Sequence, residues 1–373
     1  MKIAVNTRFL LKGKLEGIGW FTHEIFKRLV QDHPEIEWHF LFDRSYDEEF
    51  IYGSNVTPHI VRPAARHPIL WYIWYEWGVT TALKKIKPDL FISPDGYISL
   101  SSKYPVLQVL HDINFEHHPG YLPNAVAKYF RHYFPRFAKA STRLATVSQY
   151  SKNDISKTYH INPQKIDVVY NGVGNNFKPI SAEEKKQAQS KADGQPYFVF
   201  VGALNPRKNL KGMLDAFDAY CNKGGKYHFI VVGEKMYWPP EIEHTYKNMA
   251  FKDRVHFIGR LEGPVLNQIV AGAEALLFVS YFEGFGIPII EAFKAETLVI
   301  TSTKTSMPEV GGDAALYADP YNQQEIVEKM FLAEDKDLMP QYISKGIERA
   351  KHFTWDNAAQ QMWQSINNTL YGA

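Results

Sequence analysis

Short runs of apolar, β-branched and aromatic residues alternate along the chain with longer stretches that have helical spacing. Stretches 17–29 and 124–139 are amphipathic, with an apolar stripe at the period of a helix. Strands that alternate with helices are typical of βαβ units and a parallel sheet. In the first half, the apolar runs predict strands at 2–5, 38–42, 90–93, 106–110, 144–148 and 166–170.

A polar stretch then interrupts the alternation. Residues 181–196 read SAEEKKQAQSKADGQP, which is charged and rich in turn formers, so we interpret 176–195 as a linker. Beyond it the pattern restarts and predicts strands at 197–203, 227–233, 255–259, 275–280 and 298–302.

The expected fold class is therefore α/β, with two doubly wound Rossmann-like domains that face a central cleft. They span 1–175 and 196–354, and the segment 355–373, with Trp355 and Trp363 at helical spacing, is expected to form a helix that packs back across the domains. Sheets of this kind bind ligands beyond the carboxyl ends of their strands. The chemistry of the protein is therefore expected in the loops at those ends.

Composition narrows the class of protein. A length of 373 residues suits two domains, and 45% apolar with 22% charged residues is typical of a soluble globular chain. The net charge of +2 provides no field that would recruit nucleic acid. A single cysteine, Cys221, points to a reducing compartment, and the most apolar stretch, 69–79, is too short to span a bilayer. We expect a cytoplasmic location.

The most informative motif is EGFGIPIIE at 283–291, which directly follows a predicted buried strand. Pro288 favours the first turn of a helix, so the segment predicts a strand, a glycine loop and a helix N-terminus. Such an N-terminus attracts anions, and Gly284 and Gly286 let a phosphate approach the backbone. Glu291, expected in the first helical turn, and Glu283 would accept hydrogen bonds from hydroxyl groups. A nucleotide sugar, with phosphates between two hydroxyl-bearing sugars, meets these requirements, although a plain strand-to-helix turn would also fit the motif.

A second anion-binding feature stands in VGALNPRKNL, after the first strand of the second predicted domain. Arg207 supplies a planar fork of donors and Lys208 a compact charge. Because both strands end at the same edge of a sheet, these cations are expected to reach the phosphate at the glycine turn.

At this point the chain resembles a known family. EGFGIPIIE fits the E-x7-E signature of retaining glycosyltransferases of family 4, which have the GT-B architecture, and the resemblance covers nearly the whole chain. Further segments are similar to family motifs in the same order: GIGWFTHEIFKRL, VLQVLHDINF, LATVSQYSKNDI, VVYNGV, VGALNPRKN and SMPEVGGDAALYADP.

The resemblance implies roles for the matching residues. Glu291 should hold the ribose hydroxyls of the donor, and Glu283 should contact its sugar. Arg207 and Lys208 should neutralise the diphosphate, and His111 should lie near the reacting carbon. The remaining implied donor-binding positions are Gly17, Gly19, Arg260, Leu261, Gly284, Phe285 and Gly286.

Two positions depart from the family pattern. Ala203 stands where family members often carry arginine after the glycine of the basic loop, and Arg207 is expected to supply the missing charge. Glu296 stands where a glycine usually follows the E-x7-E helix. If this position has a left-handed backbone, glutamate costs on the order of 1 kcal/mol there.

The resemblance also implies the reaction. A hexose of mannose or glucose type would pass from a nucleotide diphosphate to a saccharide or lipid-linked acceptor in cell-surface polysaccharide synthesis, with retention of anomeric configuration. The PRKN form of the basic loop favours GDP-mannose as the donor. No metal or other cofactor is expected, since cations and a helix N-terminus suffice for the leaving group.

Other interpretations fit parts of the sequence. A nicotinamide dehydrogenase needs G-x-G-x-x-G directly after the first strand, whereas Gly17 and Gly19 come about ten residues later and Thr22 takes the third position. Asp335 and Asp337 match a metal-binding D-x-D motif formally but lie in a polar helical stretch. A GT-B nucleotide-sugar epimerase and a catalytically idle nucleotide-sugar-binding protein remain alternatives.

One segment suggests contact with a membrane. Residues 127–143 interleave basic with aromatic residues, as an interfacial helix does, and Pro135 is expected to interrupt the helix. A packed element with a basic outer face is the competing explanation. The sequence predicts no particular oligomeric state.

Overall fold

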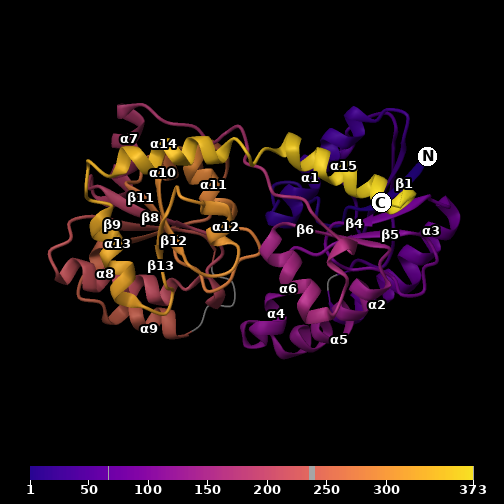
Figure 1. Cartoon of the computed structure of the whole chain (residues 1–373), viewed down its shortest axis with the longest axis horizontal. Helices are drawn as coiled ribbons and strands as arrows, with labels where there is room; N and C mark the ends of the chain where they lie inside the picture. Colours follow the sequence, from indigo (N-terminus) through magenta and orange to yellow (C-terminus); the bar gives the residue numbers. More distant parts are fainter. Residues whose placement is uncertain (66, 235–239, 373) are drawn as a thin grey trace. The chain divides into compact units, whose positions relative to one another are not determined.

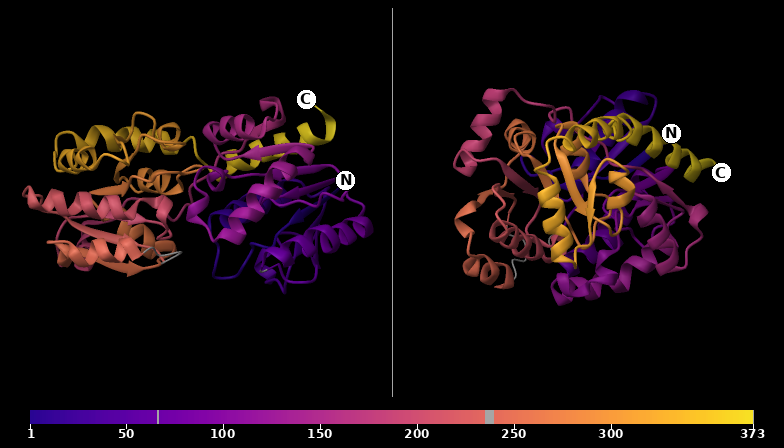
Figure 2. Two further views of the ribbon diagram at one scale, coloured as in Figure 1. Left: turned by 90° about the horizontal axis from the view of Figure 1, so that it is seen from below. Right: turned by 60° about the vertical axis from the view of Figure 1, so that its left-hand side comes forward.

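The computed structural model describes residues 1–65, 67–234 and 240–372. The chain divides into two compact units. The N-terminal unit comprises Met1–Asn171 together with Trp355–Ala373, and the C-terminal unit comprises Gly172–Thr354. Both are built on parallel sheets with helices on their two faces, as the sequence predicts (Figures 1 and 2).

The described residues of the N-terminal unit form a seven-stranded parallel sheet in the order β3-β2-β1-β4-β5-β6-β7. All six strands predicted in this half are present. Strand β3 was not predicted, because Pro58 interrupts its apolar pattern. An edge strand tolerates proline, since one side of its backbone forms no ladder. The strands are β1 (Lys2–Asn6), β2 (Glu37–Phe42), β3 (Val56–Ile60), β4 (Leu90–Ser93), β5 (Val106–Val109), β6 (Arg143–Thr146) and β7 (Ile166–Val168).

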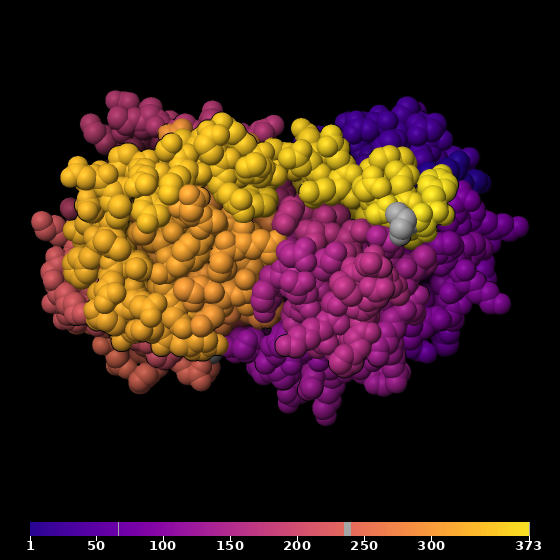
Figure 3. All heavy atoms as spheres, in the orientation of Figure 1, coloured from indigo at the N-terminus to yellow at the C-terminus, as the bar shows by residue number. Residues whose placement is uncertain are grey.

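Helices cover both faces of this sheet (Figure 1). The helix α1 (Gly17–Asp32) and the C-terminal helix α15 (Trp355–Tyr371) lie on one face, and α15 is at the surface in Figure 3. The two helices contact each other, since the ring of Trp363 stacks on His33 at 3.6 Å. The opposite face carries α2 (Pro68–Ile73), the π-helical turn η2 (Trp74–Val79), α3 (Thr80–Ile86), α4 (Asn114–His117), α5 (Asn124–Ala140) and α6 (Gln149–Tyr159).

The expected break at Pro135 is wrong, because α5 continues through it from Asn124 to Ala140. Phe134 and Phe137 on either side are buried in the core. This packing holds the helix together despite the hydrogen bond that a proline removes.

The C-terminal unit has a six-stranded parallel sheet in the described part of the chain, in the order β10-β9-β8-β11-β12-β13. The five strands predicted here are present, and the short edge strand β13 was missed. Its three residues are too few to show a period. The strands are β8 (Tyr197–Val201), β9 (His228–Val232), β10 (Val255–Gly259), β11 (Ala275–Phe278), β12 (Leu298–Ser302) and β13 (Leu316–Ala318).

Helices again lie on both faces of the sheet (Figures 1 and 2). One face carries α8 (Leu210–Asn222), α9 (Pro240–Asn248) and α13 (Gln323–Leu332). The other carries α7 (Ala182–Gln189), α10 (Gly263–Ala271), α11 (Ile287–Lys294) and α14 (Met339–Ala350), with α12 (Met307–Gly311) after β12. Short 3₁₀ turns are η1 (Glu48–Phe50), η3 (Pro119–Tyr121), η4 (Pro163–Lys165), η5 (Ser190–Ala192), η6 (Pro206–Lys208) and η7 (Lys252–Arg254).

The stretch 176–195 is not the linker that its polarity suggested. It contains α7, which begins with a capping box in which Ser181 and Glu184 each accept a hydrogen bond from the other's backbone. Ala188 and Ala192 are buried, and the segment belongs to the C-terminal unit. The S-x-x-E pattern of Ser181 and Glu184 could have predicted the start of this helix. The charged residues on the outer face of the helix made the segment resemble a linker instead.

Helix α11 ends in a Schellman motif at the position where the sequence departs from the family. The N–H of Thr297 donates to the Ala292 carbonyl at 2.9 Å, and the N–H of Glu296 donates to that of Phe293 at 3.2 Å. Glu296 itself has φ of 58°, in the left-handed region. The condition stated for this position, a left-handed backbone, is therefore met.

Replacing Glu296 by glycine should raise the free energy of unfolding by about 1 kcal/mol, because glycine has no Cβ to clash in this conformation. Thermal or urea unfolding of the full chain measures the change. Glu296→Ala is the matched control, since alanine removes the same side chain but keeps the strained Cβ. Equal stability of the two variants would contradict the strain argument.

Candidate active site

The candidate site of the C-terminal unit lies in two loops that follow neighbouring strands. Strand β11 pairs with β8 in parallel, so the segment after Val201 and the segment after Phe278 leave the same edge of the sheet side by side. A backbone hydrogen bond joins the loops, from the Tyr281 N–H to the Arg207 carbonyl at 2.9 Å. The predicted convergence of the basic loop and the glycine turn within this unit follows from the strand order.

Three charged residues meet where the loops touch. Arg207 Nη1 donates to Glu283 Oε2 at 2.7 Å, and Lys208 Nζ lies 2.6 Å from the other carboxylate oxygen, Oε1. Arg207 Nη1 also donates to the Phe282 carbonyl at 3.0 Å. Lys208 Nζ lies 4.8 Å from the centre of the Phe278 ring, in a cation–π contact. One carboxylate therefore lies between two cations, and the cluster as a whole keeps a positive charge.

The charge states of this cluster follow from its burial. Lys208 is 7% exposed and Glu283 is 5% exposed. Burial alone would raise the pKa of Glu283, but the charges of Arg207 and Lys208 outweigh it and hold the pKa below its ordinary value. Glu283 is consequently ionised at neutral pH. Glu283 holds both cations in place, and a more highly charged anion could take the place of its carboxylate.

Residues that the sequence analysis did not single out hold the loops in position. Asn209, which has a left-handed backbone, donates through Nδ2 to the carbonyls of Val279 and Pro320 at 2.9 and 3.1 Å. Ser306 Oγ donates to the carbonyls of Glu283 and Phe285 at 2.9 and 3.0 Å, and Thr305 Oγ1 accepts the Glu283 N–H at 3.1 Å. The sequence signal for them is that Asn209 ends the family-like segment VGALNPRKN and Ser306 begins the segment SMPEVGGDAALYADP.

The glycine turn has the predicted course. Gly286 has φ of 101° and precedes α11, and Pro288 stands in the first turn of that helix. Gly284 and Phe285 lie in the loop before it, and Phe285 is 3% exposed. The strand, glycine loop and helix N-terminus thus follow one another as expected, a geometry that favours a bound anion.

Glu291 occupies the second turn of α11, one position later than the first turn in which the sequence placed it. Among the residues that the structure describes, none forms a hydrogen bond or ion pair with its side chain, and burial raises its pKa to about 8. A half-buried carboxyl group without a partner destabilises the protein when it is ionised. Ligand hydroxyl groups would provide the missing partners.

Arg260 and Leu261 follow β10, at the far edge of the sheet from β11. Arg260 pairs with Glu262, its Nε donating to Oε1 at 2.8 Å. The order of the strands separates both residues from the cluster around Glu283. The structure thus places them at the expected end of the sheet but not in the cluster.

Three predicted residues belong to the N-terminal unit, at the carboxyl ends of β1 and β5. Gly17 and Gly19 begin α1, and a Cβ on Gly19 would lie only 2.9 Å from the Phe9 carbonyl oxygen, so glycine is required there. His111 follows β5, and its ring packs edge-on against Phe21 of α1 at 4.9 Å. The start of α1 and His111 are therefore neighbours.

His111 is held in one tautomer. Its Nε2 lies 2.9 Å from the Pro94 carbonyl oxygen, and because a carbonyl only accepts, Nε2 carries the proton. Burial lowers the pKa of the ring, so His111 is neutral at pH 7 with Nδ1 unprotonated. The side chain offers an acceptor and not a positive charge.

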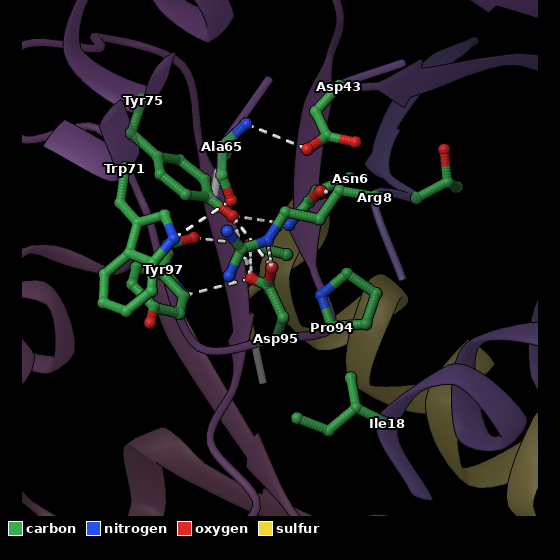
Figure 4. Close-up of polar contacts among 12 residues, drawn as sticks. Asn6, Arg8, Ile18, Asp43, Ala65, Trp71, Tyr75, Pro94, Asp95 and Tyr97 are labelled. Carbon is green, nitrogen blue, oxygen red and sulfur yellow. Dashed lines mark hydrogen bonds and ion pairs between the residues drawn. The ribbon is translucent and has the colours of Figure 1, made fainter. Parts of the chain in front are cut away.

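A buried charged cluster at the same edge of this sheet escaped the sequence analysis (Figure 4). Arg8 lies in the turn that follows β1. It forms an ion pair with Asp95 at 2.5 Å, and both side chains are 5% exposed or less. Tyr75 donates to Asp95 at 2.9 Å, and Arg8 lies 4.5 Å from the centre of the Tyr97 ring. Burial alone would lower the pKa of Arg8, but Asp95 more than offsets this and raises it. Asp95, the partner of Arg8, directly follows Pro94, whose carbonyl contacts His111.

The formal D-x-D motif has a local structural role. Asp335 Oδ1 accepts the backbone N–H groups of Asp337 and Leu338 at 2.9 and 3.3 Å. It closes the turn before α14, on the surface. His117 Nε2, in α4, lies within hydrogen-bonding distance of Asp154 Oδ1, at 2.8 Å.

Comparison with known proteins agrees with this geometry. Residues 15–175 match the family "Glycosyltransferase Family 4", and residues 181–350 match "Glycosyl transferases group 1". The chain is 26% identical to the O-antigen chain mannosyltransferase B of Escherichia coli, over 97% of this chain and 98% of that one. It is 28% identical to the O-antigen chain mannosyltransferase RfbU of Salmonella typhimurium, over 85% and 86% of the two chains.

A solved structure with the same fold is that of HepE from Anabaena, in complex with UDP and glucose. It has a TM-score of 0.77 and 16% identity, and the comparison covers 99% of this chain and all of that one. At this identity the likeness concerns the fold. Together, the two family matches cover most of the sequence, and each includes all strands of one sheet except β1, which precedes residue 15. The chain therefore belongs to the glycosyltransferases, with a family 4 domain followed by a group 1 domain.

Proposed function

We propose that the protein is a retaining, metal-independent hexosyltransferase that moves mannose or a similar hexose from a nucleoside diphosphate to a saccharide or lipid-linked acceptor. The observation that carries this proposal is the buried cluster of Arg207, Lys208 and Glu283 beside the helix α11 N-terminus. The O-antigen mannosyltransferases among its relatives favour mannose and a polysaccharide acceptor. The PRKN loop favours GDP as the carrier.

The chemistry that this cluster would perform is stabilisation of the leaving group. When the bond between the sugar and the diphosphate breaks, negative charge grows on the phosphate oxygens. Arg207 and Lys208 would exchange their contacts with Glu283 for contacts with those oxygens, and donors fixed in advance are the most effective kind. The released Glu283 carboxylate would then accept hydrogen bonds from hydroxyl groups of the sugar.

The remaining predicted residues take supporting roles in this proposal. Glu291 would accept hydrogen bonds from the ribose hydroxyls, and the backbone at Gly284, Phe285 and Gly286 would approach the diphosphate. Arg260 and Leu261 would border the base. In the N-terminal unit, His111, with Gly17 and Gly19 beside it, would orient the donor sugar through its ring or its backbone carbonyl.

The direct test is release of the nucleotide from a panel of GDP- and UDP-sugars, with and without EDTA and with acceptor mixtures in parallel. Release from one donor, raised by acceptor and unaffected by EDTA, is the expected result. Free sugar produced without any acceptor would indicate an epimerase instead. Binding of a donor without turnover would indicate an idle binding protein.

The raised pKa of Glu291 predicts pH-dependent binding of the donor. Ribose hydroxyls favour the ionised carboxylate, so binding must remove a proton below a pH of about 8. Affinity for the nucleoside diphosphate should therefore increase as the pH rises towards 8 and then level off. Titration calorimetry across this range measures it, and in Glu291→Gln the dependence should flatten while affinity falls.

The same group predicts a change in stability. A carboxyl group whose pKa is raised by folding destabilises the ligand-free protein increasingly as the pH rises from 4.5 to about 8. Glu291→Gln should therefore unfold at a higher temperature than the parent at pH 8 but not at pH 4.5. An offset that does not change with pH would contradict the assigned charge state.

We extend the proposal to contact with an anionic membrane surface. No helix within residues 1–65, 67–234 and 240–372 is long and apolar enough to cross a bilayer. In α5, Phe134 and Phe137 face the core, while Lys128, Arg136 and Lys139 are exposed, so the helix has a basic outer face. This alone matches a packed surface helix as well as a membrane-binding one.

The neighbouring helical segments α2 and η2 supply the exposed apolar side chains that α5 lacks. Ile69 and Trp77 on α2 and η2 are 65% and 66% exposed, and Tyr72, 42% exposed, packs its ring 5.9 Å from Tyr133 of α5. Exposed apolar side chains beside basic ones are typical of interfacial binding. The chain should co-sediment with vesicles that contain phosphatidylglycerol and not with pure phosphatidylcholine vesicles. Trp77→Ser should weaken this binding, and an unchanged sedimentation would contradict the proposed surface.

A further inference from the structure

Three potential metal ligands converge at the edge of the C-terminal sheet, away from the site described above. His228 opens β9 and His256 is the second residue of the adjacent strand β10. His228 Nδ1 and His256 Nε2 are 2.9 Å apart, and the rings are stacked with centres 5.2 Å apart. Asp193 Oδ2 lies 3.8 Å from His256 Nε2, and the three ligand atoms all lie within 4.8 Å of one another.

These distances are close to those of a coordinated ion. Zinc–nitrogen bonds of about 2.0–2.1 Å at tetrahedral angles place neighbouring ligand atoms about 3.3 Å apart. The observed separations of 2.9 and 3.8 Å lie on either side of that value. The side chain of Asp193 is 71% exposed, so it can move towards the histidines without disturbing the core. Small rotations of side chains would complete the geometry.

The chemical state of the ligands also suits a metal. A histidine binds through an unprotonated nitrogen. His228 Nδ1 and His256 Nε2 share one hydrogen at 2.9 Å, so one of these two nitrogens is an unprotonated acceptor. Arg254 is the nearby group that would oppose a cation. Its guanidinium is turned to the Gly225 carbonyl, to which it donates at 3.0 Å.

We propose that Asp193, His228 and His256 form a binding site for one divalent cation of the zinc class, with water completing the coordination. Two imidazoles and one carboxylate are a donor set that favours Zn²⁺ over Mg²⁺ or Ca²⁺, which prefer oxygen ligands. The charge of Arg254 nearby should limit the affinity to the micromolar range.

The position of the site separates it from the transfer chemistry. His228 and His256 stand at the amino ends of their strands, whereas Arg207, Lys208 and Glu283 follow the carboxyl ends of strands in the same parallel sheet. Bound metal would instead fasten the turn after η5, which carries Asp193, to the edge strand β10. The role is therefore structural, and the inference does not depend on the proposed function.

The chain also contains a matched pair of histidines for comparison. His39 Nδ1 and His59 Nε2, on the neighbouring strands β2 and β3, are likewise 2.9 Å apart. In the part of the chain that the structure describes, no carboxylate completes this pair within the same limit. Glu37 lies 4.0 Å from His39 Nε2, which is the ring nitrogen that does not face His59. The pair tests whether two close histidines are enough to bind the ion.

The experiment titrates ZnCl₂ into the full chain after removal of metal, by calorimetry, with Co²⁺ absorption as a spectroscopic report of the ligands. The variants are Asp193→Asn, which tolerates the left-handed backbone there, His256→Gln, and His59→Gln as the control. We expect one ion per chain, affinity about tenfold or more weaker in the first two variants, and no change in the third. Zn²⁺ should also raise the unfolding temperature of the parent and of His59→Gln, but not that of Asp193→Asn or His256→Gln.

Three results would overturn the proposal: no stoichiometric binding, binding that survives Asp193→Asn and His256→Gln, or an equal loss in His59→Gln. Turnover measured on the same samples separates this inference from the proposed function. Removal of metal should lower the unfolding temperature without changing the rate of transfer. A loss of transfer on removal of metal would contradict the metal-independent mechanism and the structural role together.

Discussion

Replacing Lys208 by alanine should lower kcat for sugar transfer by a factor of about 10²–10³, the effect of removing one donor to a developing oxyanion. The ammonium group is buried, fixed by Glu283 at 2.6 Å and by the Phe278 ring, and cannot be replaced by a mobile surface cation. Steady-state kinetics with the donor identified in the release assay measures the change. Most of the effect should fall on kcat, because the charge on the leaving group grows as the bond breaks.

Lys211→Ala is the matched control, since Lys211 lies three residues further along, is about half exposed and, among the residues described, pairs only with Asp215. Its kinetics should equal those of the parent. The unfolding temperature of Lys208→Ala should also be measured, because Glu283 keeps Arg207 as its partner in that variant. A folded Lys208→Ala protein with normal turnover would disprove the assignment of the phosphate-binding loop.

Replacing Asp95 by asparagine should lower the free energy of unfolding by about 3–5 kcal/mol, the cost of leaving a buried charge without its partner. Arg8 would keep its position among Tyr75, Tyr97 and Phe9 but lose the only carboxylate that pairs with it among the residues described. Urea unfolding measures the loss, and hydrogen exchange should locate it in the N-terminal unit.

Glu37→Gln is a suitable control, because its ion pair with Lys2 is exposed and should contribute less than about 1 kcal/mol. The double variant Arg8→Met with Asp95→Asn should recover part of the stability, since it removes the unpaired charge. Losses from Arg8→Met and Asp95→Asn that simply add in the double variant would show that the pair is not coupled.

Much of the fold was predictable, because its determinants are local. Every strand predicted in either unit is present, since buried parallel strands are continuous apolar runs and differ from amphipathic helices in period. The exceptions are instructive. Strand β3 contains Pro58, β13 has three residues, and the charged outer face of α7 was mistaken for a linker. The apolar pattern was interrupted in β3, too short in β13 and too polar in α7 to show its periodicity.

The candidate site was predictable in its residues but not in its contacts. Arg207, Lys208 and Glu283 could be chosen because each follows an apolar strand, and the position of a residue along a strand is a local property. That the two cations share the Glu283 carboxylate was not predictable, because it depends on β11 lying beside β8. Similarly, Arg260 was assigned to the base before the strand order placed it at the far edge.

The sequence alone therefore determined the alternation of strands and helices, the two sheets, and the residues that end each strand. The resemblance to the family, which usually has glycine at position 296, had also raised the possibility of the left-handed backbone found at Glu296. Only the tertiary structure decided which strand ends are neighbours, and so brought Arg8 to Asp95 across 87 positions and His228 to His256 across 28. The physical reason is that hydrophobic periodicity is written into adjacent residues, whereas the pairing of charges depends on the order in which the strands assemble.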